Sequence, residues 1–587
     1  MIPETGEGGG SGDAALLPYK EIWLVDFEFQ APAGERHHPI CMVAQELYSG
    51  RLIRMWRDEL ITLRQAPFDC GSDSLFVAYY ASAEFGCFLT LGWTFPVSIL
   101  DLFSEHRCIT NGLRLPHGNG LIGALAYWGL AHIDAGEKAS MRQLIMDNSA
   151  WSAEQQSDIL DYCQADVTAL AALLQRLALE LDVPRALPRG RFMAAVARME
   201  WTGIPIDVPA YERLRVGWDS IRAQLVADVD RSYGVYIGLT FKESLFAAYL
   251  KRSGIAWPCH PSGSLKLDKK TFKTMARLHP ILEPLRQLRK TFAQMRLSEL
   301  AVGLDGRNRC LLSPFRSKTG RNQPKSSVFI FGSARWLRGL IRPPDGYGLA
   351  YIDFSSQEIA IAAALSNDKL MIQGYTEGDP YLAFAKAARI VPSDASKSSH
   401  KIERDRCKSV VLGMNYGMRE NTLATSLGIA PVEARALMRL HENTYRDFWS
   451  WSRRVVDDAT QTLQTRSVFG WRHQFGCDES SSALMNFPMQ ANGAEMMRIT
   501  AIAATEAGIE VCAPIHDAFL IQAPLDQLDE RVEQMRDLMT RAGCAVTGGF
   551  PVRTDVTIVR YPDRYGDGGE AMWDRVMALL PDEAEAA

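Results

Sequence analysis

The chain has 587 residues, 47% of them hydrophobic, and a formal net charge of -5 at pH 7. The hydrophobic content excludes a disordered chain, and the length exceeds what one hydrophobic core supports, so we expect two to four domains. The small negative charge does not by itself indicate nucleic-acid binding, so the local distribution of charge has to decide that question.

The cysteines and the apolar runs indicate a soluble protein of a reducing compartment. None of the eleven cysteines forms a Cys-x-x-Cys pair, which argues against a zinc site or a disulfide framework. The longest apolar run, 121–131, is too short and too rich in glycine to span a bilayer, and the N-terminus lacks a signal-peptide pattern. We expect a cytoplasmic protein with no membrane partner and with a flexible, glycine-rich tail over residues 1–18.

The first ordered element predicted is a strand over residues 22–29. Its alternation places Asp26 and Glu28 on one face, about 7 Å apart, where two carboxylates can share a cation, although an exposed edge strand shows the same pattern. Residues 157–181 have a helical pattern in which Tyr162 and Asp166 lie one turn apart.

An Asp-x-Glu strand followed by a Tyr-x-x-x-Asp helix resembles the DEDDy class of 3′-to-5′ exonucleases, which have an RNase H-like fold. The resemblance implies an exonuclease-like domain over residues 19–182, with two divalent ions, Mg²⁺ or Mn²⁺, held by Asp26, Glu28 and Asp166. It also implies that Tyr162 orients the attacking water. Glu84 stands where this class has a further ligand Asp, and the longer side chain puts the rate of this activity in question.

The segment 183–190 contains two prolines and a terminal glycine, so we predict a linker. Further on, residues 306–344 contain nine Lys or Arg and no acidic residue. This basic segment leads into a short apolar run, 349–352, that reads as a buried strand ending at Asp353, before a helical pattern begins. A helix N-cap would explain an aspartate there, but a carboxylate among apolar neighbours also suits a bound cation.

Two later stretches complete a pattern with this strand. Residues 511–521 predict a hairpin with His516 and Asp517 at its tip. Between the two carboxylates, a basic helical segment has four residues at every fourth position, which places them on one side of a helix. These four are Arg404, Lys408, Leu412 and Tyr416.

A carboxylate strand, a basic helix and a carboxylate hairpin, in this order, resemble motifs A, B and C of family A DNA polymerases. The resemblance implies an α/β multidomain fold in which a right-hand polymerase domain, 191–587, follows the nuclease-like domain. We expect a thumb at about 191–305, a palm at about 306–359 and 466–587, and fingers at about 360–465. The family's optional 5′-nuclease domain is expected to be missing, as in polymerases of bacterial viruses, so the bacterial cytoplasm of an infected host is the expected location.

The resemblance also implies roles at the polymerase site. Asp353, Asp517 and the carbonyl of Phe354 would hold two Mg²⁺ ions, so that the primer 3′-oxygen attacks the α-phosphate of a dNTP. The remaining expected catalytic residues are Arg404 and Lys408 on the triphosphate, Tyr416 near the templating base, His516 near the primer terminus and Glu358 as a steric gate under the sugar. The expected DNA or substrate contacts are Arg321, Arg338, Gln357, Leu412, Asn486 and Gln490, of which Arg321 and Gln490 suit the minor-groove acceptors common to all base pairs.

Two further departures from the family pattern bear on metal and sugar binding at the polymerase site. Ala518 occupies the place of a glutamate that follows the hairpin aspartate, and Leu412 occupies the place of an aromatic residue that packs on the sugar. The first departure weakens the expected metal coordination, and the second puts recognition of the ribose in question.

The sequence thus favours a monomeric template-directed DNA polymerase with a proofreading 3′-to-5′ exonuclease. Its partners would be primer-template DNA, dNTPs, and a processivity factor or other replisome proteins. A single-subunit RNA polymerase is an alternative that Ala518 suits and Glu358 opposes. A catalytically weakened DNA-binding replication scaffold is another, which the joint presence of Asp353, Asp517, Arg404 and Lys408 opposes.

Overall fold

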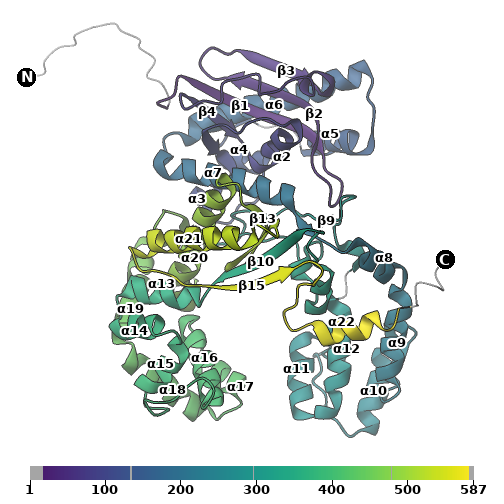
Figure 1. Ribbon diagram of the computed structural model, residues 1–587, viewed down its shortest axis with the longest axis vertical. Coiled ribbons are helices and arrows are strands. Elements are labelled where there is room, and N and C mark those ends of the chain that lie inside the picture. Colours follow the sequence, from purple (N-terminus) through teal and green to yellow (C-terminus); the bar gives the residue numbers. More distant parts are fainter. Residues whose placement is uncertain (1–16, 132–134, 295–296, 477–478, 581–587) are drawn as a thin grey trace, which may run out of the picture.

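The computed structural model describes residues 17–131, 135–294, 297–476 and 479–580. The expected tail therefore lies, apart from residues 17 and 18, outside the described residues. An N-terminal α/β domain sits on top of a larger body in which two groups of helices extend from a central sheet (Figure 1). This is the mixed α/β multidomain architecture that the sequence predicted.

The N-terminal domain is built on a five-stranded sheet in the order β3-β2-β1-β4-β5, with β1 at its centre. Alternate residues of β1 enter two different cores: Leu24 enters the core that β1 shares with helix α6 on one face, and Val25 enters the core that includes residues of α2 and α7 on the other. The strands are β1 Glu21–Gln30, β2 His38–Glu46, β3 Leu52–Trp56, β4 Ser74–Ala78 and β5 Ser98–Asp101. The helices are α1 Arg57–Leu60, α2 Ser82–Leu91, α3 Leu102–Thr110, α4 Leu121–Tyr127, α5 Ala135–Asp147 and α6 Ala153–Leu177.

The linker predicted at 183–190 is wrong, because these residues form the first two turns of helix α7, Val183–Thr202. Pro184 lies in the first turn, where a backbone N–H has no helical partner and a proline fits. Gly190 is required by packing, since a Cβ there would lie 2.1 Å from the carbonyl oxygen of Ile99 in β5. Helix α7 contacts α2 and β5 of the N-terminal domain as well as α20 and β13 of the larger body.

The central sheet of the larger body has the order β13-β14-β10-β15 and is antiparallel throughout. Helices α20 and α21 cover the face on which Ile352 and Phe519 lie, while Asp353 alternates onto the opposite face. The strands are β10 Tyr347–Phe354, β13 Glu510–Ile515, β14 Ala518–Pro524 and β15 Thr554–Arg560. The associated elements are η3 Ile330–Gly332, η4 Arg335–Leu340, α13 Gln357–Ser366, β11 Gln464–Arg466, β12 Arg472–Gln474, α20 Ser481–Glu506, α21 Leu528–Thr547 and α22 Glu570–Met577.

Two helical groups flank the gap below this sheet (Figure 1). The first group and its connections are β6 Ile204–Pro205, α8 Val208–Val216, α9 Trp218–Asp230, β7 Tyr236–Ile237, β8 Thr240–Phe241, α10 Glu243–Arg252, α11 Lys269–Leu278, η1 Pro280–Leu282, α12 Glu283–Gln294, η2 Leu297–Glu299 and β9 Arg307–Asn308. The second group comprises α14 Lys369–Thr376, α15 Pro380–Ala387, α16 Lys401–Asn415, α17 Glu420–Leu427, α18 Pro431–Thr444 and α19 Arg446–Thr462. Within the described parts of the chain, none of the helices has both the length and the apolar composition that a bilayer crossing requires.

Candidate active sites

Asp353 and Asp517 meet at one end of the central sheet. Asp353 is the second-last residue of β10 and pairs in register with Ala518, and the backbone N–H of Phe354 donates to the Asp517 carbonyl over 3.0 Å. The predicted hairpin is confirmed: β13 and β14 are joined by His516 and Asp517, and His516 takes the left-handed backbone that a two-residue turn favours, with φ at 55°.

Both carboxyl groups are held in an environment that disfavours their charge. Burial raises the pKa of Asp353 to about 6, and the neighbouring charges of Asp517 and Asp555 add to this shift. Burial also raises the pKa of Asp517. A hard divalent cation stabilises the charged form of adjacent carboxyl groups that otherwise resist ionisation, so this set of oxygen donors fits Mg²⁺.

The structure adds a third carboxylate, Asp555, that the sequence reasoning missed. It lies on β15 directly opposite Asp353, so the two side chains share one face of the sheet, and Ser355 Oγ donates to its Oδ2 over 2.5 Å. Ala518, at the place of the family glutamate, is completely buried. The missed signal was an acidic residue within an alternating strand pattern, which becomes informative only once β15 is known to pair with β10.

Helix α16 presents the expected residues along one side. Arg404 is bound by Asp379 over 2.8 Å and by Asp405 over 3.0 Å, and its guanidinium lies 5.0 Å from the ring centre of Tyr381. The exposed Lys408 places its ammonium group 5.5 Å from the same ring.

The C-terminal end of this helix lies next to Glu358. Tyr416 is the C-cap of α16 rather than a residue within it, and 42% of it is exposed. Burial and then a hydrogen bond with Glu358 raise the pKa of the Tyr416 phenol. Leu412, one turn earlier, is half-buried and packs against the main core.

Glu358 is bound from the opposite side by Arg321. Its Oε1 accepts from Arg321 Nη2 over 3.0 Å, and only 15% of the Glu358 side chain is exposed. Arg321 also lines a cavity of about 560 Å³ together with Gln490 and His516. The structure therefore brings the expected gate, both expected minor-groove donors and the hairpin tip to one place.

Three other residues that were expected to contact DNA have side chains bound or buried elsewhere. Gln357 is 2% exposed and its amide donates to the Gly493 carbonyl over 3.4 Å, so it faces α20 rather than the cavity, which corrects our expectation. Arg338 is held by an ion pair with Asp567 and donates to the Phe331 carbonyl over 2.8 Å. Asn486 has a buried side-chain oxygen with no hydrogen-bond partner.

The N-terminal domain contains a second cluster of carboxylates. Asp26, Glu28 and Asp166 each offer an oxygen, and these oxygens all lie within 4.8 Å of one another. Burial and the charge of Asp166 raise the pKa of Asp26 to about 7, and burial raises the pKa of Glu28 well above its ordinary range. This donor set fits a hard divalent cation for the same reason as the first site. Tyr162 lies one turn before Asp166 on α6, and its phenol pKa is raised by burial and by Asp166.

Glu84 lies beside this cluster. It is 3% exposed in the first turn of α2, and its Oε2 has no hydrogen-bond partner. Burial and then the charges of Asp26 and Glu28 raise its pKa, which places it within electrostatic reach of them. The sequence reasoning missed Lys138 of α5, whose Nζ lies 2.6 Å from Asp166 Oδ2. No motif marked this lysine.

The comparisons with known proteins agree with one another, since the relatives they give are DNA polymerases. Residues 324–560 match the model of DNA polymerase family A. The chain is 23% identical over 395 residues to DNA polymerase I of Aquifex aeolicus, covering 65% of this chain and 67% of that protein. It is 25% identical over 403 residues to the DNA polymerase of Mycobacterium phage D29, covering 65% of each. The match to the thermostable DNA polymerase I of Thermus aquaticus, at 22% identity, covers 59% of this chain and 44% of that protein.

The fold is shared with a solved structure over nearly the whole chain. The POL domain of Pol1 from M. smegmatis, in a complex described as containing DNA primer-template and dNTP, superimposes with a TM-score of 0.72 at 20% identity. The likeness covers 92% of this chain and 95% of that one, so it includes the N-terminal domain.

Proposed function

Because residues 324–560 belong to DNA polymerase family A, we propose that this chain is a template-directed DNA polymerase that adds deoxynucleotides to a primer 3′-hydroxyl. The observation that carries the proposal is the meeting of Asp353 and Asp517, with raised pKa values, at the end of the sheet beside the cavity that Arg321 and Gln490 line.

Two Mg²⁺ ions, held by Asp353, Asp517 and the Phe354 carbonyl, would supply activation of the primer oxygen and neutralisation of the phosphate charge. Asp555 supplies a further carboxylate near Asp353, in the absence of a glutamate at position 518. Lys408 and Arg404 attract the triphosphate electrostatically, Arg404 being held in place by Asp379.

Glu358 selects the sugar of the incoming nucleotide in this proposal. Its carboxylate is fixed between Arg321 and Tyr416, so it cannot move aside without losing both partners. A 2′-hydroxyl placed against it would be desolvated without a good partner, which costs about 1–3 kcal/mol and disfavours ribonucleotides.

The proposal is tested by single-nucleotide insertion on a primer-template with Mg²⁺, using dNTP and rNTP in parallel. Asp353→Ala and Asp517→Ala should each reduce insertion by at least about a thousandfold, because each removes a proposed metal ligand. Asp526→Ala is the matched control, since Asp526 is exposed just past the far end of strand β14. Insertion by Asp517→Ala at the parent rate would exclude the site, and equal use of dNTP and rNTP by the parent would favour the RNA polymerase alternative.

We further propose that the N-terminal domain is a 3′-to-5′ exonuclease that acts on the primer end. Asp26, Glu28 and Asp166 would hold the divalent ions, Glu84 would add an oxygen, and Tyr162 would orient water. Lys138 offsets part of the negative charge of Asp166.

The double variant Asp26→Ala with Glu28→Ala should lose degradation of a labelled single strand while retaining nucleotide insertion. Asp158→Ala provides the control, because Asp158 is exposed on the same helix as Asp166, two turns earlier. Degradation that persists in the double variant would assign the nuclease activity to another site or to a contaminant.

A further inference from the structure

The end of helix α3 in the N-terminal domain is joined to the larger body by a buried asparagine. Asn111 is 1% exposed, and its Nδ2 donates to the carbonyls of Lys318 over 2.6 Å and of Arg472 over 2.7 Å. The fit is close, because the next residue, Gly112, has φ at 93° and a Cβ there would lie 1.8 Å from the Gln474 carbonyl oxygen.

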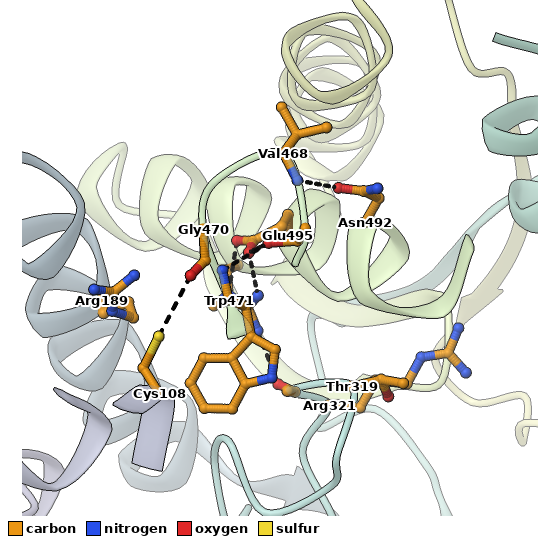
Figure 2. A network of polar contacts seen from close by, with 12 residues as sticks. Cys108, Arg189, Thr319, Arg321, Val468, Gly470, Trp471, Asn492 and Glu495 are labelled. Atoms are coloured by element: carbon orange, nitrogen blue, oxygen red, sulfur yellow. Dashed lines mark hydrogen bonds and ion pairs between the residues drawn. The ribbon is translucent and has the colours of Figure 1, made fainter. Parts of the chain in front are cut away.

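Neighbouring residues of α3 extend this contact. Arg107 Nη2 donates to the carbonyls of Phe315 and Arg316, each over 3.3 Å. Cys108 Sγ donates to the Gly470 carbonyl over 3.4 Å, as Figure 2 shows. Helix α3 therefore binds two segments of the larger body, one of which leads directly into Arg321.

The turn that carries Arg321 is held through its backbone. Lys318 O also accepts from Trp471 Nε1 over 3.0 Å, and Gly320 O accepts from Arg498 Nη1 over 2.8 Å. The Arg321 N–H donates to Ser317 Oγ over 2.7 Å, which closes the turn. In Figure 2 the indole of Trp471, which follows Gly470 in the connection between β11 and β12, points toward the turn of Thr319 and Arg321.

The support of this turn is itself buried and charged. Arg498 is paired with Glu495 over 2.8 Å, and Ser467 Oγ donates to Glu495 over 2.6 Å. The side chains of Arg498 and Glu495 are 5% and 9% exposed. A turn fixed by so many buried partners transmits a displacement at Lys318 instead of absorbing it.

From these contacts we infer that Asn111 of the N-terminal domain is a positioning residue for Arg321, so the nuclease-like domain forms part of the structure that supports nucleotide selection. This inference rests on the proposed polymerase function. Removing the Asn111 amide takes one donor from the Arg472 carbonyl and leaves the Lys318 carbonyl with Trp471 Nε1, so the balance of bonds that holds Lys318 changes and the cheapest relief is a shift of the 317–321 turn. A shift of about 1 Å would misplace the Arg321 guanidinium against Glu358 and the base pair.

The test is a double-mutant cycle measured by single-nucleotide insertion with a nuclease-resistant phosphorothioate primer terminus. Asn111→Asp keeps the volume and removes the donor, and should raise KM for the correct dNTP about tenfold with little change in kcat. The same change in an Arg321→Ala background should have an effect of less than about twofold, because Asn111 acts through Arg321. Rescue is tested with Asn111→Gln, which restores an amide donor and should recover part of the loss.

Matched controls separate positioning from general loosening of the domains. Glu35→Ala removes another bond between the same two regions, the 2.7 Å bond from the Leu304 N–H to Glu35 Oε1, which does not reach the Arg321 turn. It should leave KM unchanged. If the Asn111 variants do not fold, Arg107→Gln takes their place, because it removes the guanidinium donors to Phe315 and Arg316. It is measured in the same two backgrounds and judged by the same change in KM.

The outcomes are distinct. An effect of Asn111→Asp that is equal in both backgrounds, or no effect in either, overturns the inference, because a positioning residue must lose its effect when its target is removed. Absence of insertion by the parent protein would instead overturn the proposed polymerase function, and it is measured first.

Discussion

At the scale of one residue, the carboxyl group of Asp353, a proposed cation ligand, makes the folded protein less stable when it is ionised. Its folded-state pKa, about 6, lies above the unfolded value near 4, so the folded state binds the proton more tightly. Stability from this group is therefore complete below about pH 4 and is lost as the pH rises through about 6. Above that range the folded protein holds a charge that its surroundings disfavour.

Asp353→Asn should therefore raise the denaturation temperature at pH 8 in the absence of divalent ions. We expect a gain of about 1 kcal/mol, which is less than the pKa shift alone implies because Asp353 is only half-buried. The gain should disappear at pH 4, where the parent carboxyl is protonated. Thermal denaturation at both pH values checks this, with Asp526→Asn as the control, and a gain that is the same at pH 4 and pH 8 would contradict the electrostatic explanation.

Single residues were predictable from the sequence where a local pattern marked them. Asp353 lies at the end of a strand and Asp517 at the tip of a hairpin, and each pattern can be recognised within a window of about ten residues. Asp555 and Lys138 were not predictable, because each joins its site through a strand register or a helix position that depends on the whole fold. The role of Gln357 was predicted wrongly, because its side chain contacts Gly493, a residue far away in the sequence that no local pattern could indicate.

At the scale of elements, helix α7 determines how the two parts of the molecule join. Its N-terminal half carries Arg189, which forms a buried bidentate ion pair with Glu105 of α3, and Gly190, which packs against β5. The sequence pattern of prolines and glycine predicted a linker, because local propensity cannot reveal that a glycine is needed for close packing.

Gly190→Ala should destabilise the protein although alanine is the better helix former. The helix gains about 1 kcal/mol from the substitution, but the new Cβ meets the Ile99 carbonyl at 2.1 Å, and overpacking of this kind costs about 1–3 kcal/mol or more. We expect a lower denaturation temperature by calorimetry. Gly120→Ala is the control, since Gly120 is the N-cap of α4 and has no atom within 4 Å of a new Cβ. An unchanged denaturation temperature for Gly190→Ala would contradict this prediction and show that β5 shifts to accommodate the new Cβ.

At the scale of the whole molecule, one continuous hydrophobic cluster crosses the boundary between the N-terminal domain and the central sheet. It contains Val25 of β1, Phe192 of α7 and Ile352 of β10, all buried. The group of helices α10 and α11 has a separate small core around Phe246 and Phe272. The chain is thus expected to unfold as one large unit with a less stable helical group, rather than as a nuclease unit and a polymerase unit.

Native-state hydrogen exchange at increasing denaturant tests this division. Amides of β1 and β10 should exchange with the same free energy of opening, and those of α10 and α11 with a smaller one, because opening follows the shared core. Phe192→Ala should lower the opening free energy of β1 and β10 together by about 3–5 kcal/mol, since the removed ring is buried in the cluster that both strands enter.

Phe272→Ala is the matched variant, because Phe272 is as deeply buried as Phe192, with 3% of each exposed. It should lower the opening free energy of α10 and α11 by a similar amount and leave β1 and β10 unchanged, since its core contains no residue of either strand. If Phe192→Ala affected β10 and left β1 unchanged, the two domains would open independently, and α7 would join them covalently without coupling their stability. If both strands respond together, the nuclease-like domain is part of the cooperative unit that holds Asp353 in place.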